Sequence, residues 1–333
     1  MGRRTTARWQ AGNCYTLGVM RNHMSWQRRG RRLGLNVVVF VCCLATTPVF
    51  ALDGKQSVAP EAPGDLVRRA VANEVADAHN TSVKHLFRSR KQGPHGSQTK
   101  LYVQTTEAMA GMLIAVDDKP VTPQQIEGEA AHLEHLINDP DDLRRKQKQE
   151  REDAERTLRI VKALPDAFLY EYDGEEPSQP GVGKAGDQLV RLKFRPNPHY
   201  SPPSRVEQVL TGMEGSLLID KGALRLAKIE ARLFRDVTFG WGILGHLDRG
   251  GTFTVCQADV GDGSWELTHL QLSMTGKVLL VKSISIKLDE VLSDFRRVPS
   301  DLTFAKGVEL LKTEVARMQS AMPENASASR KQQ

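Results

Sequence analysis

The sequence predicts an α+β fold: a strongly curved antiparallel β-sheet, shaped as an unclosed half-barrel, with helices covering its concave face. Three observations lead to this prediction. About ten strand-like runs are joined mostly by short turns rich in Gly, Asp and Pro, as in antiparallel hairpins. Strands and helices do not alternate along the chain, which argues against a parallel nucleotide-binding sheet. Some strands carry apolar side chains on both faces, so helices or a ligand must cover the second face.

Residues 1–51 have the three parts of a secretory signal peptide. Four arginines at 28–32 precede an apolar run at 33–44, and Val49 and Ala51 have the side chains that signal peptidase accepts before its cleavage site. The run is shorter than the roughly 20 residues that a membrane-spanning helix needs. We therefore expect cleavage after Ala51, a periplasmic or otherwise exported protein, and no transmembrane span after cleavage. An uncleaved N-terminal anchor is the alternative.

Two questions about this leader stay open. Met20 or Met24 also fits as the start of the protein, which would make residues 1–19 a mis-called extension. The pair Arg31-Arg32 is similar to a twin-arginine export signal, so both the Sec and the twin-arginine routes fit the leader.

The positive charge of the chain belongs to the leader. The net charge is +6, and residues 1–51 contain eight of the 46 Lys and Arg side chains and no acid. The remaining residues carry 38 basic and 40 acidic side chains, a balance of −2, so we expect no nucleic-acid partner. Of the four cysteines only Cys256 follows residue 51, which excludes an internal disulfide in the cleaved chain. We expect Cys256 to be buried on a strand.

Residues 52–64 are rich in small polar residues, Pro and Gly, and are predicted to form a flexible lead-in. A single domain is expected over residues 65–318, because no interior linker appears. Asp65 is the expected N-cap of a first helix, in which apolar residues recur at helical spacing as far as Val75. Three strands are predicted to follow, at residues 83–91, 100–106 and 109–116.

Two helices are expected next, at residues 123–138 with Thr122 as the cap, and at about 141–164. Between residues 144 and 159 only two side chains are apolar, and almost all the others are charged or Gln. Such a helix has little apolar surface to place in a core. We therefore expect a charged helix that projects from the domain at about 141–164. A partner-docking arm is the alternative.

Strands dominate the rest of the chain. They are predicted at residues 167–172, 188–194, 216–220, 223–237, 251–260, 264–274 and 277–288. A proline-rich connection at 195–203 and a short helix at 205–210 interrupt them. A closing helix at 304–318 precedes residues 319–333, which we expect to be a disordered tail.

Two of these strands have apolar residues on both faces. Simple alternation places Trp265 and Leu267 on one face of their strand, and Leu270, Leu272 and Met274 on the other. In the next strand, alternation gives one face to the even-numbered apolar residues and the other to two odd-numbered ones. The first set is Val278, Leu280, Ile284, Ile286 and Leu288, and the second is Leu279 and Val281.

The motifs that resemble cofactor or metal sites lack the context they need. Residues 240–245 match G-x-G-x-x-G, but a strand follows where a dinucleotide site needs a helix. Residues 181–184 lack the spacing and the Ser or Thr of a phosphate loop. Glu129, His132 and His135 share a helix face, but no second such motif exists, so a surface cluster is the simpler interpretation. We expect no catalytic residue, metal or cofactor, and no enzyme.

A further signal is the order of segments between residues 212 and 303. The segments concerned are 213–220, 226–233, 237–240, 263–267 with its Trp near a turn, and the hairpin ending at Asp294-Phe295. This order resembles the LolA/LppX-like superfamily of bacterial envelope lipoprotein and lipid carriers. The resemblance implies an exported protein with an unclosed, curved antiparallel barrel and helices over the concave face. It transfers no functional residue.

Together these observations predict a non-catalytic envelope protein that binds an acyl chain, a lipid or a lipid-modified peptide in the concavity of the sheet. The expected ligand-binding residues are Phe239, Trp241, Ile243, Trp265, Val278 and Leu280. One alternative is an envelope scaffold protein whose core is filled by its own side chains and whose contact surface, for an envelope protein partner, is the charged helix at 141–164. An envelope hydrolase is the other alternative.

Overall fold

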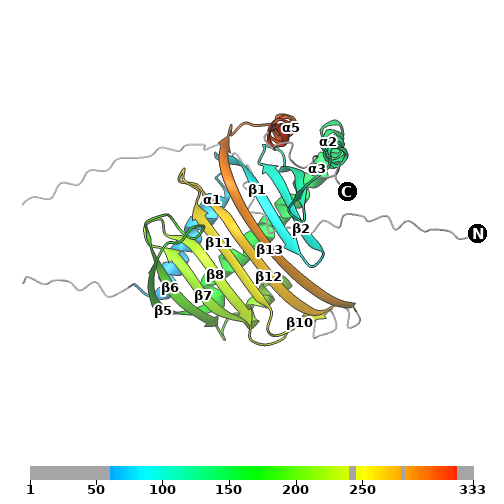
Figure 1. The fold of residues 1–333 in the computed structure, drawn as a ribbon. Coiled ribbons are helices and arrows are strands. Elements are labelled where there is room, and N and C mark those ends of the chain that lie inside the picture. The colour runs from blue at the N-terminus through cyan, green and yellow to red at the C-terminus, as the bar shows by residue number, and fades with distance from the viewer. Residues whose placement is uncertain (1–60, 81, 240–244, 279–281, 321–333) are drawn as a thin grey trace, which may run out of the picture.

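The computed structural model describes residues 61–80, 82–239, 245–278 and 282–320. The predicted signal peptide, its cleavage site, residues 52–60 of the predicted lead-in and residues 321–333 lie outside the described residues. Within the described part, the fold is α+β, with one open antiparallel sheet and five α-helices (Figure 1), which confirms the predicted fold class. The helices are α1 (Pro63–Ala78), α2 (Pro123–Asn138), α3 (Pro140–Ala167), α4 (Arg205–Gln208) and α5 (Phe304–Ser320).

The strands are most often joined to their sequence neighbours by short turns. They are β1 (Lys84–Gly93), β2 (Gly96–Val103), β3 (Ala110–Val116), β4 (Lys119–Pro120), β5 (Phe168–Pro177), β6 (Gln188–Pro196), β7 (Met213–Asp220), β8 (Arg225–Leu233), β9 (Val237–Phe239), β10 (Gly245–Leu247), β11 (Thr252–Asp259), β12 (Trp265–Val278) and β13 (Lys282–Val298). Their order across the sheet is β4-β3-β2-β1-β13-β12-β11-β8-β7-β6-β5, and β10 pairs with β12 and β9. The sheet therefore ends in free edges at β4 and β5 and is not closed into a barrel.

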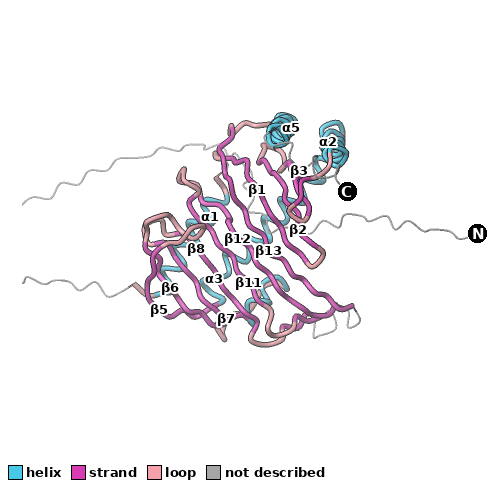
Figure 2. The backbone as a smooth tube through the Cα atoms, viewed as in Figure 1, coloured by secondary structure: helices cyan, strands magenta, loops and turns pink. Residues whose placement is uncertain are grey.

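Helices α1 and α3 lie behind the sheet in the view of Figure 1 and form a second layer with it (Figure 2). Their apolar side chains pack on the inner face of β5–β8 in one core cluster. In α1 the buried positions are Leu66, Val67, Ala70, Val71 and Glu74, a spacing of three and four that gives one buried stripe. The helix begins at Pro63 with Ala62 as its N-cap, so the expected cap at Asp65 is wrong. Pro at the first turn starts the helix earlier.

Helices α2 and α5 cover the opposite face of the sheet, at β1–β3. Leu101 and Met112 are paired across β2 and β3 and belong to the core cluster that α5 and α2 complete with Phe304 and Leu133. Because side chains alternate along a strand, Tyr102 and Gly111 face the α3 side instead. The predicted cap of α2 is confirmed, since Thr122 and Gln125 form a reciprocal capping box.

Several of the predicted strand limits are wrong, and the last strand, expected at 277–288, is β13 at Lys282–Val298. The run at 223–237 divides into β8 and β9, and the turn expected between the runs at 264–274 and 277–288 lies inside β12, which continues to Val278. Gly276 pairs there with Leu247 and Ile284. A Cβ on Gly276 would lie 2.2 Å from the His246 carbonyl oxygen, so this glycine permits close strand approach and does not mark a turn.

The charged helix does not project from the domain as expected. Positions such as Leu143, Glu150, Ala154, Thr157 and Val161 of α3 are partly buried at helical spacing, so one face of α3 lies along the sheet. The reason is that long charged side chains cover apolar surface with their aliphatic stems while their charged ends find partners.

Glu150 shows how such a charged group is accommodated. Its carboxylate accepts a hydrogen bond from the Met109 backbone N–H at 3.1 Å and contacts the Lys146 ammonium at 2.7 Å. Burial raises the pKa of Glu150 above its ordinary value despite these contacts.

None of the described helices is both long enough and apolar enough to cross a membrane.

Candidate functional site: an apolar cavity under the sheet

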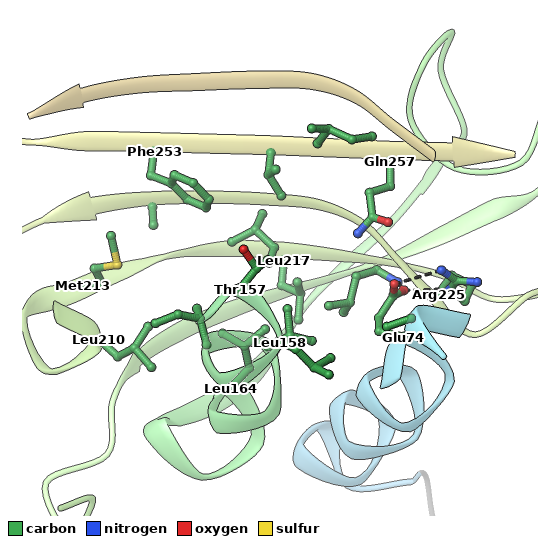
Figure 3. Close-up of a pocket in the computed structure, with 18 of the residues that line it drawn as sticks. Glu74, Thr157, Leu158, Leu164, Leu210, Met213, Leu217, Arg225, Phe253 and Gln257 are labelled. Atoms are coloured by element: carbon green, nitrogen blue, oxygen red, sulfur yellow. Dashed lines mark hydrogen bonds and ion pairs between the residues drawn. The ribbon is translucent and has the colours of Figure 1, made fainter. Parts of the chain in front are cut away.

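A cavity of about 340 Å³ lies between α3, the end of α1 and the inner face of the sheet (Figure 3). Its sheet side is formed by β5–β8, β11 and β12, and its helix side mainly by the second half of α3. The volume is within the range of roughly 300–1,000 Å³ that is typical of small-molecule sites. Most of the described residues around it are apolar, so water in the cavity has few hydrogen-bond partners and a ligand displaces it easily.

The helix side of the cavity comes from the segment that the sequence marked as charged. Thr157 and Leu158 of α3 point toward the sheet, and Leu164 lies one to two turns further along (Figure 3). The Tyr170 hydroxyl donates a hydrogen bond to the Leu164 carbonyl oxygen at 2.7 Å, which ties the end of α3 to β5. Burial raises the pKa of Tyr170 well above its ordinary value. The helix is therefore held against the sheet at one end of the cavity.

Aromatic side chains close the cavity at the β5 edge of the sheet. The rings of Phe168 and Phe194 lie 4.5 Å apart between centroids, and Tyr170 lies 6.3 Å from each of them. These distances are those of stabilising aromatic pairs. The three rings line the part of the cavity at β5 and β6, and the lining continues from there to β11 and β12.

A β-bulge in β12 determines which side chains reach the cavity. Cys256 of β11 faces His269, and Gln257 faces Leu267, so Thr268 is the extra residue. The bulge turns Trp265 and Leu267 to the same side as Leu272 and Met274, and all four line the cavity. The expectation that these residues lie on opposite faces is therefore wrong, because strict alternation does not hold across a bulge.

A buried ion pair lies at the α1 end of the cavity. The Glu74 carboxylate contacts the Arg225 guanidinium through two hydrogen bonds of 2.8 and 2.9 Å and accepts a third, of 2.9 Å, from the Leu226 N–H (Figure 3). Asp77 contacts the same guanidinium at 3.1 Å. The central carbon of this guanidinium lies 5.4 Å from the centre of the Trp265 ring. Burial alone would lower the pKa of Arg225, but the hydrogen bond to Glu74 and the charges of Glu74 and Asp77 outweigh it and raise the pKa.

A second polar group lies beside the cavity and connects β1 to the β11–β12 turn. The buried His85 ring contacts Glu266 through Nδ1 at 2.9 Å and Asp262 through Nε2 at 3.1 Å. Burial alone would lower the pKa of His85, but the two carboxylates outweigh it and leave the pKa above its ordinary value. For Asp262, burial acts to raise the pKa, but hydrogen bonds from His85 and Ser264 lower it to about 2.

The six residues expected to bind the ligand have different places. Trp265 lines the cavity, with 6% of its surface exposed. Phe239 is half-buried in β9 and packs against the same core cluster but not on the cavity. Val278 is the last residue of β12 and pairs with Gly245, and its side chain is not described. Trp241, Ile243 and Leu280 lie outside the described residues, as does most of the G-x-G-x-x-G segment.

Metal binding has one candidate cluster in the described residues, and it differs from the predicted histidine face. His135, Asp139 and Asp142 have ligand atoms within 4.8 Å of one another. Asp139 is the N-cap of α3 and accepts hydrogen bonds from two backbone N–H groups, while Asp142 contacts His135 at 3.1 Å. Glu129 accepts a hydrogen bond from the Leu113 N–H. These carboxylates have structural roles, so the cluster gives no support for a metal.

Sequence reasoning missed most of the cavity. Glu74 had a detectable signal, because a carboxylate at that position interrupts the apolar stripe of α1 and needs a buried partner. Nothing in the sequence connects it to Arg225, which lies in a strand far along the chain. Gln257 and the aromatic cluster at β5 and β6 gave no signal either. Cys256 is buried on β11 as expected, and burial raises its pKa.

Comparisons of this chain with family models, with curated proteins and with solved structures find no match. The resemblance to LolA/LppX-like carriers therefore stays a prediction, and the conclusions below depend on the cavity and its residues.

Proposed function

We propose that this protein is an exported, non-catalytic envelope protein that binds an acyl chain, a lipid or a lipid-modified peptide in the cavity under its sheet. The observation that carries the proposal is the cavity of about 340 Å³ between α3 and the curved sheet, with its mainly apolar lining. Burial of the ligand drives binding, at roughly 0.8 kcal/mol for each methylene group removed from water. The leader at residues 1–51 supports the exported location.

The cavity favours this function over a scaffold with a self-filled core. In a filled core, the side chains of α3 and the sheet would interdigitate and leave few voids larger than one water molecule. Here Thr157 and Ala154 are small side chains that α3 contributes to the lining, together with apolar residues of β11 and β12. Small residues on the helix leave room that an apolar ligand can occupy.

The proposal is tested by filling the cavity. The full chain is expressed with its leader, purified from the periplasm without harsh detergent, and analysed by native mass spectrometry and lipid extraction. Thr157→Trp places a large ring in the cavity, whereas Glu155→Trp places the same ring on the exposed side of α3. We expect a stoichiometric lipid on the unaltered protein and on Glu155→Trp, and at least tenfold less on Thr157→Trp.

Circular dichroism and the melting temperature establish that both variants are folded. Binding of the neutral fluorescent probe N-phenyl-1-naphthylamine gives a second readout that does not depend on the lipid of the host. An unaltered protein that carries no lipid and does not bind the probe would contradict the proposal, as would equal lipid on the two variants.

A further inference from the structure

The polar residues at the α1 end of the cavity select the kind of acyl ligand, and this argument rests on the proposed function. The charged residues that line the cavity are Glu74, Asp77, Arg225 and Glu266. They are three carboxylates and one guanidinium. Binding an anion there would add a fourth negative group to a region that already has an excess of them.

The one guanidinium among these residues already contacts two carboxylates of the protein. Arg225 is held by Glu74 through two hydrogen bonds and by Asp77 at 3.1 Å, and Trp265 lies over its face. Its side chain is only 11% exposed. A ligand carboxylate that approached Arg225 would meet the negative charges of Glu74 and Asp77, which already contact the same guanidinium.

The remaining charges beside this end are paired as well. Glu266 contacts His85, and the other ring nitrogen of His85 contacts Asp262, which also contacts Arg297 at 2.9 Å. The Gln104 side-chain oxygen accepts a hydrogen bond from the His85 N–H. Within the described residues, these contacts leave no cation at this end of the cavity that lacks a carboxylate.

Gln104 and Gln257 are the carboxamides that line the cavity, and Gln257 is the one whose oxygen also stays available. Its carboxamide points into the cavity from β11, on the side where Glu74 and Arg225 lie (Figure 3). In the part of the chain that the structure describes, its side chain has no hydrogen-bond partner, although a carboxamide offers two N–H donors and one acceptor oxygen. An amide facing an apolar cavity is complementary to an uncharged group that both accepts and donates hydrogen bonds.

We propose that the cavity selects acyl esters and amides with an uncharged polar end, such as monoacylglycerols, and discriminates against free fatty acid anions. The acyl chain lies between α3 and the sheet, and the ester or amide carbonyl accepts a hydrogen bond from Gln257. The carboxylates at this end repel an anionic ligand. An ammonium ligand gains little from them, because each already has a cationic partner in the protein and does not replace the water that the ammonium group loses on burial.

The test is displacement of N-phenyl-1-naphthylamine by three ligands with the same chain, at pH 8: 1-decanoylglycerol, decanoate and decylammonium. We expect 1-decanoylglycerol to displace the probe at a concentration at least tenfold below that of either charged ligand. Asp77→Asn removes one of the carboxylates and should reduce the preference over decanoate several-fold. Asp141→Asn, at an exposed position of α3, makes the same change of charge outside the cavity and should leave the preference as it is.

Gln257→Leu tests the hydrogen bond. It should weaken 1-decanoylglycerol relative to the probe by roughly fivefold, which is the effect expected of one hydrogen bond. Decanoate or decylammonium binding as tightly as 1-decanoylglycerol would overturn the selectivity and leave the proposed function in place. A protein that does not bind the probe or any of the three ligands would overturn both.

Discussion

Glu74 and Arg225 tie α1 to β8 through an ion pair whose side chains are only 9% and 11% exposed. Replacing one partner of such a pair leaves a buried charge without its counter-ion, which costs more than the pair contributes. Glu74→Ala should therefore lower the free energy of unfolding by about 3 kcal/mol, because Arg225 keeps only Asp77. Urea denaturation measures this change.

Glu61→Ala is the matched control for this prediction. Glu61 also pairs with an arginine, Arg69, but both side chains are well exposed. Its replacement should cost less than about 1 kcal/mol, as for other surface pairs. Equal costs for the two variants would mean that the Glu74 pair is not buried in solution.

His85 makes the stability of the fold depend on pH. The pKa of His85 is raised in the folded protein, so its stabilising contribution is complete below the ordinary value of 6.5 and is lost as the pH rises through the folded pKa. Asp262 has the opposite sign, since its pKa is lowered to about 2, and its contribution is lost as the pH falls from about 4 toward that value.

His85→Gln isolates the histidine contribution. The difference in unfolding free energy between the unaltered protein and His85→Gln should be largest below pH 6.5 and should shrink toward pH 9, measured by urea denaturation in a series of buffers. A difference that is constant across this range would show that His85 carries no extra proton in the folded state.

The bulge at Thr268 connects one strand to the formation of the whole cavity. Without the extra residue, a shift of one position would turn Leu270, Leu272 and Met274 away from the core. Deletion of Thr268 should therefore abolish the cooperative unfolding transition and probe binding, measured by near-UV circular dichroism and fluorescence.

Thr268→Ala keeps the residue count and is the control for the deletion. The Thr268 hydroxyl donates a hydrogen bond to the Gly181 carbonyl oxygen at 2.6 Å, so the variant should lose only about 1 kcal/mol. Loss of folding in this variant would mean that the hydrogen bond, and not the extra residue, maintains the strand.

The elements that the sequence predicted well are those with a local cause. Helix α2 follows from Thr122, Pro123 and apolar spacing, and the β7–β8 hairpin follows from a turn in which Asp220 accepts two backbone hydrogen bonds. The features that were missed depend on distant segments. The bulge in β12 depends on its pairing with β11, and Gly276 appears turn-like until β10 is placed beside it.

The cavity could be predicted only in outline. The apolar second faces of the strands indicated that something covers them, but α3 was expected to project because its charged residues conceal a partly buried stripe. Four elements, α1, β8, β11 and β12, contribute to the polar end, and α1 lies far from the other three in the chain. No periodicity in one segment contains that information.

Occupation of the cavity should stabilise the entire molecule, because the ligand binds only where α3 and the sheet are assembled. At a concentration one hundred times the dissociation constant, a ligand adds about 2.7 kcal/mol to the free energy of unfolding. For a domain of this size that corresponds to a rise in melting temperature of roughly 5–10 °C. Differential scanning fluorimetry with 1-decanoylglycerol measures the shift, and Thr157→Trp should show none.

The pairing of β1 with β13 has a consequence for how the chain reaches its native state. Lys84 lies opposite Val298, so the first strand finds its neighbour only after almost all of the described chain has been synthesised. Until then the β1–β3 hairpins present an unpaired edge and an apolar face that α5, the last helix, has yet to cover. The sheet is therefore completed only after β13 and α5 have been synthesised.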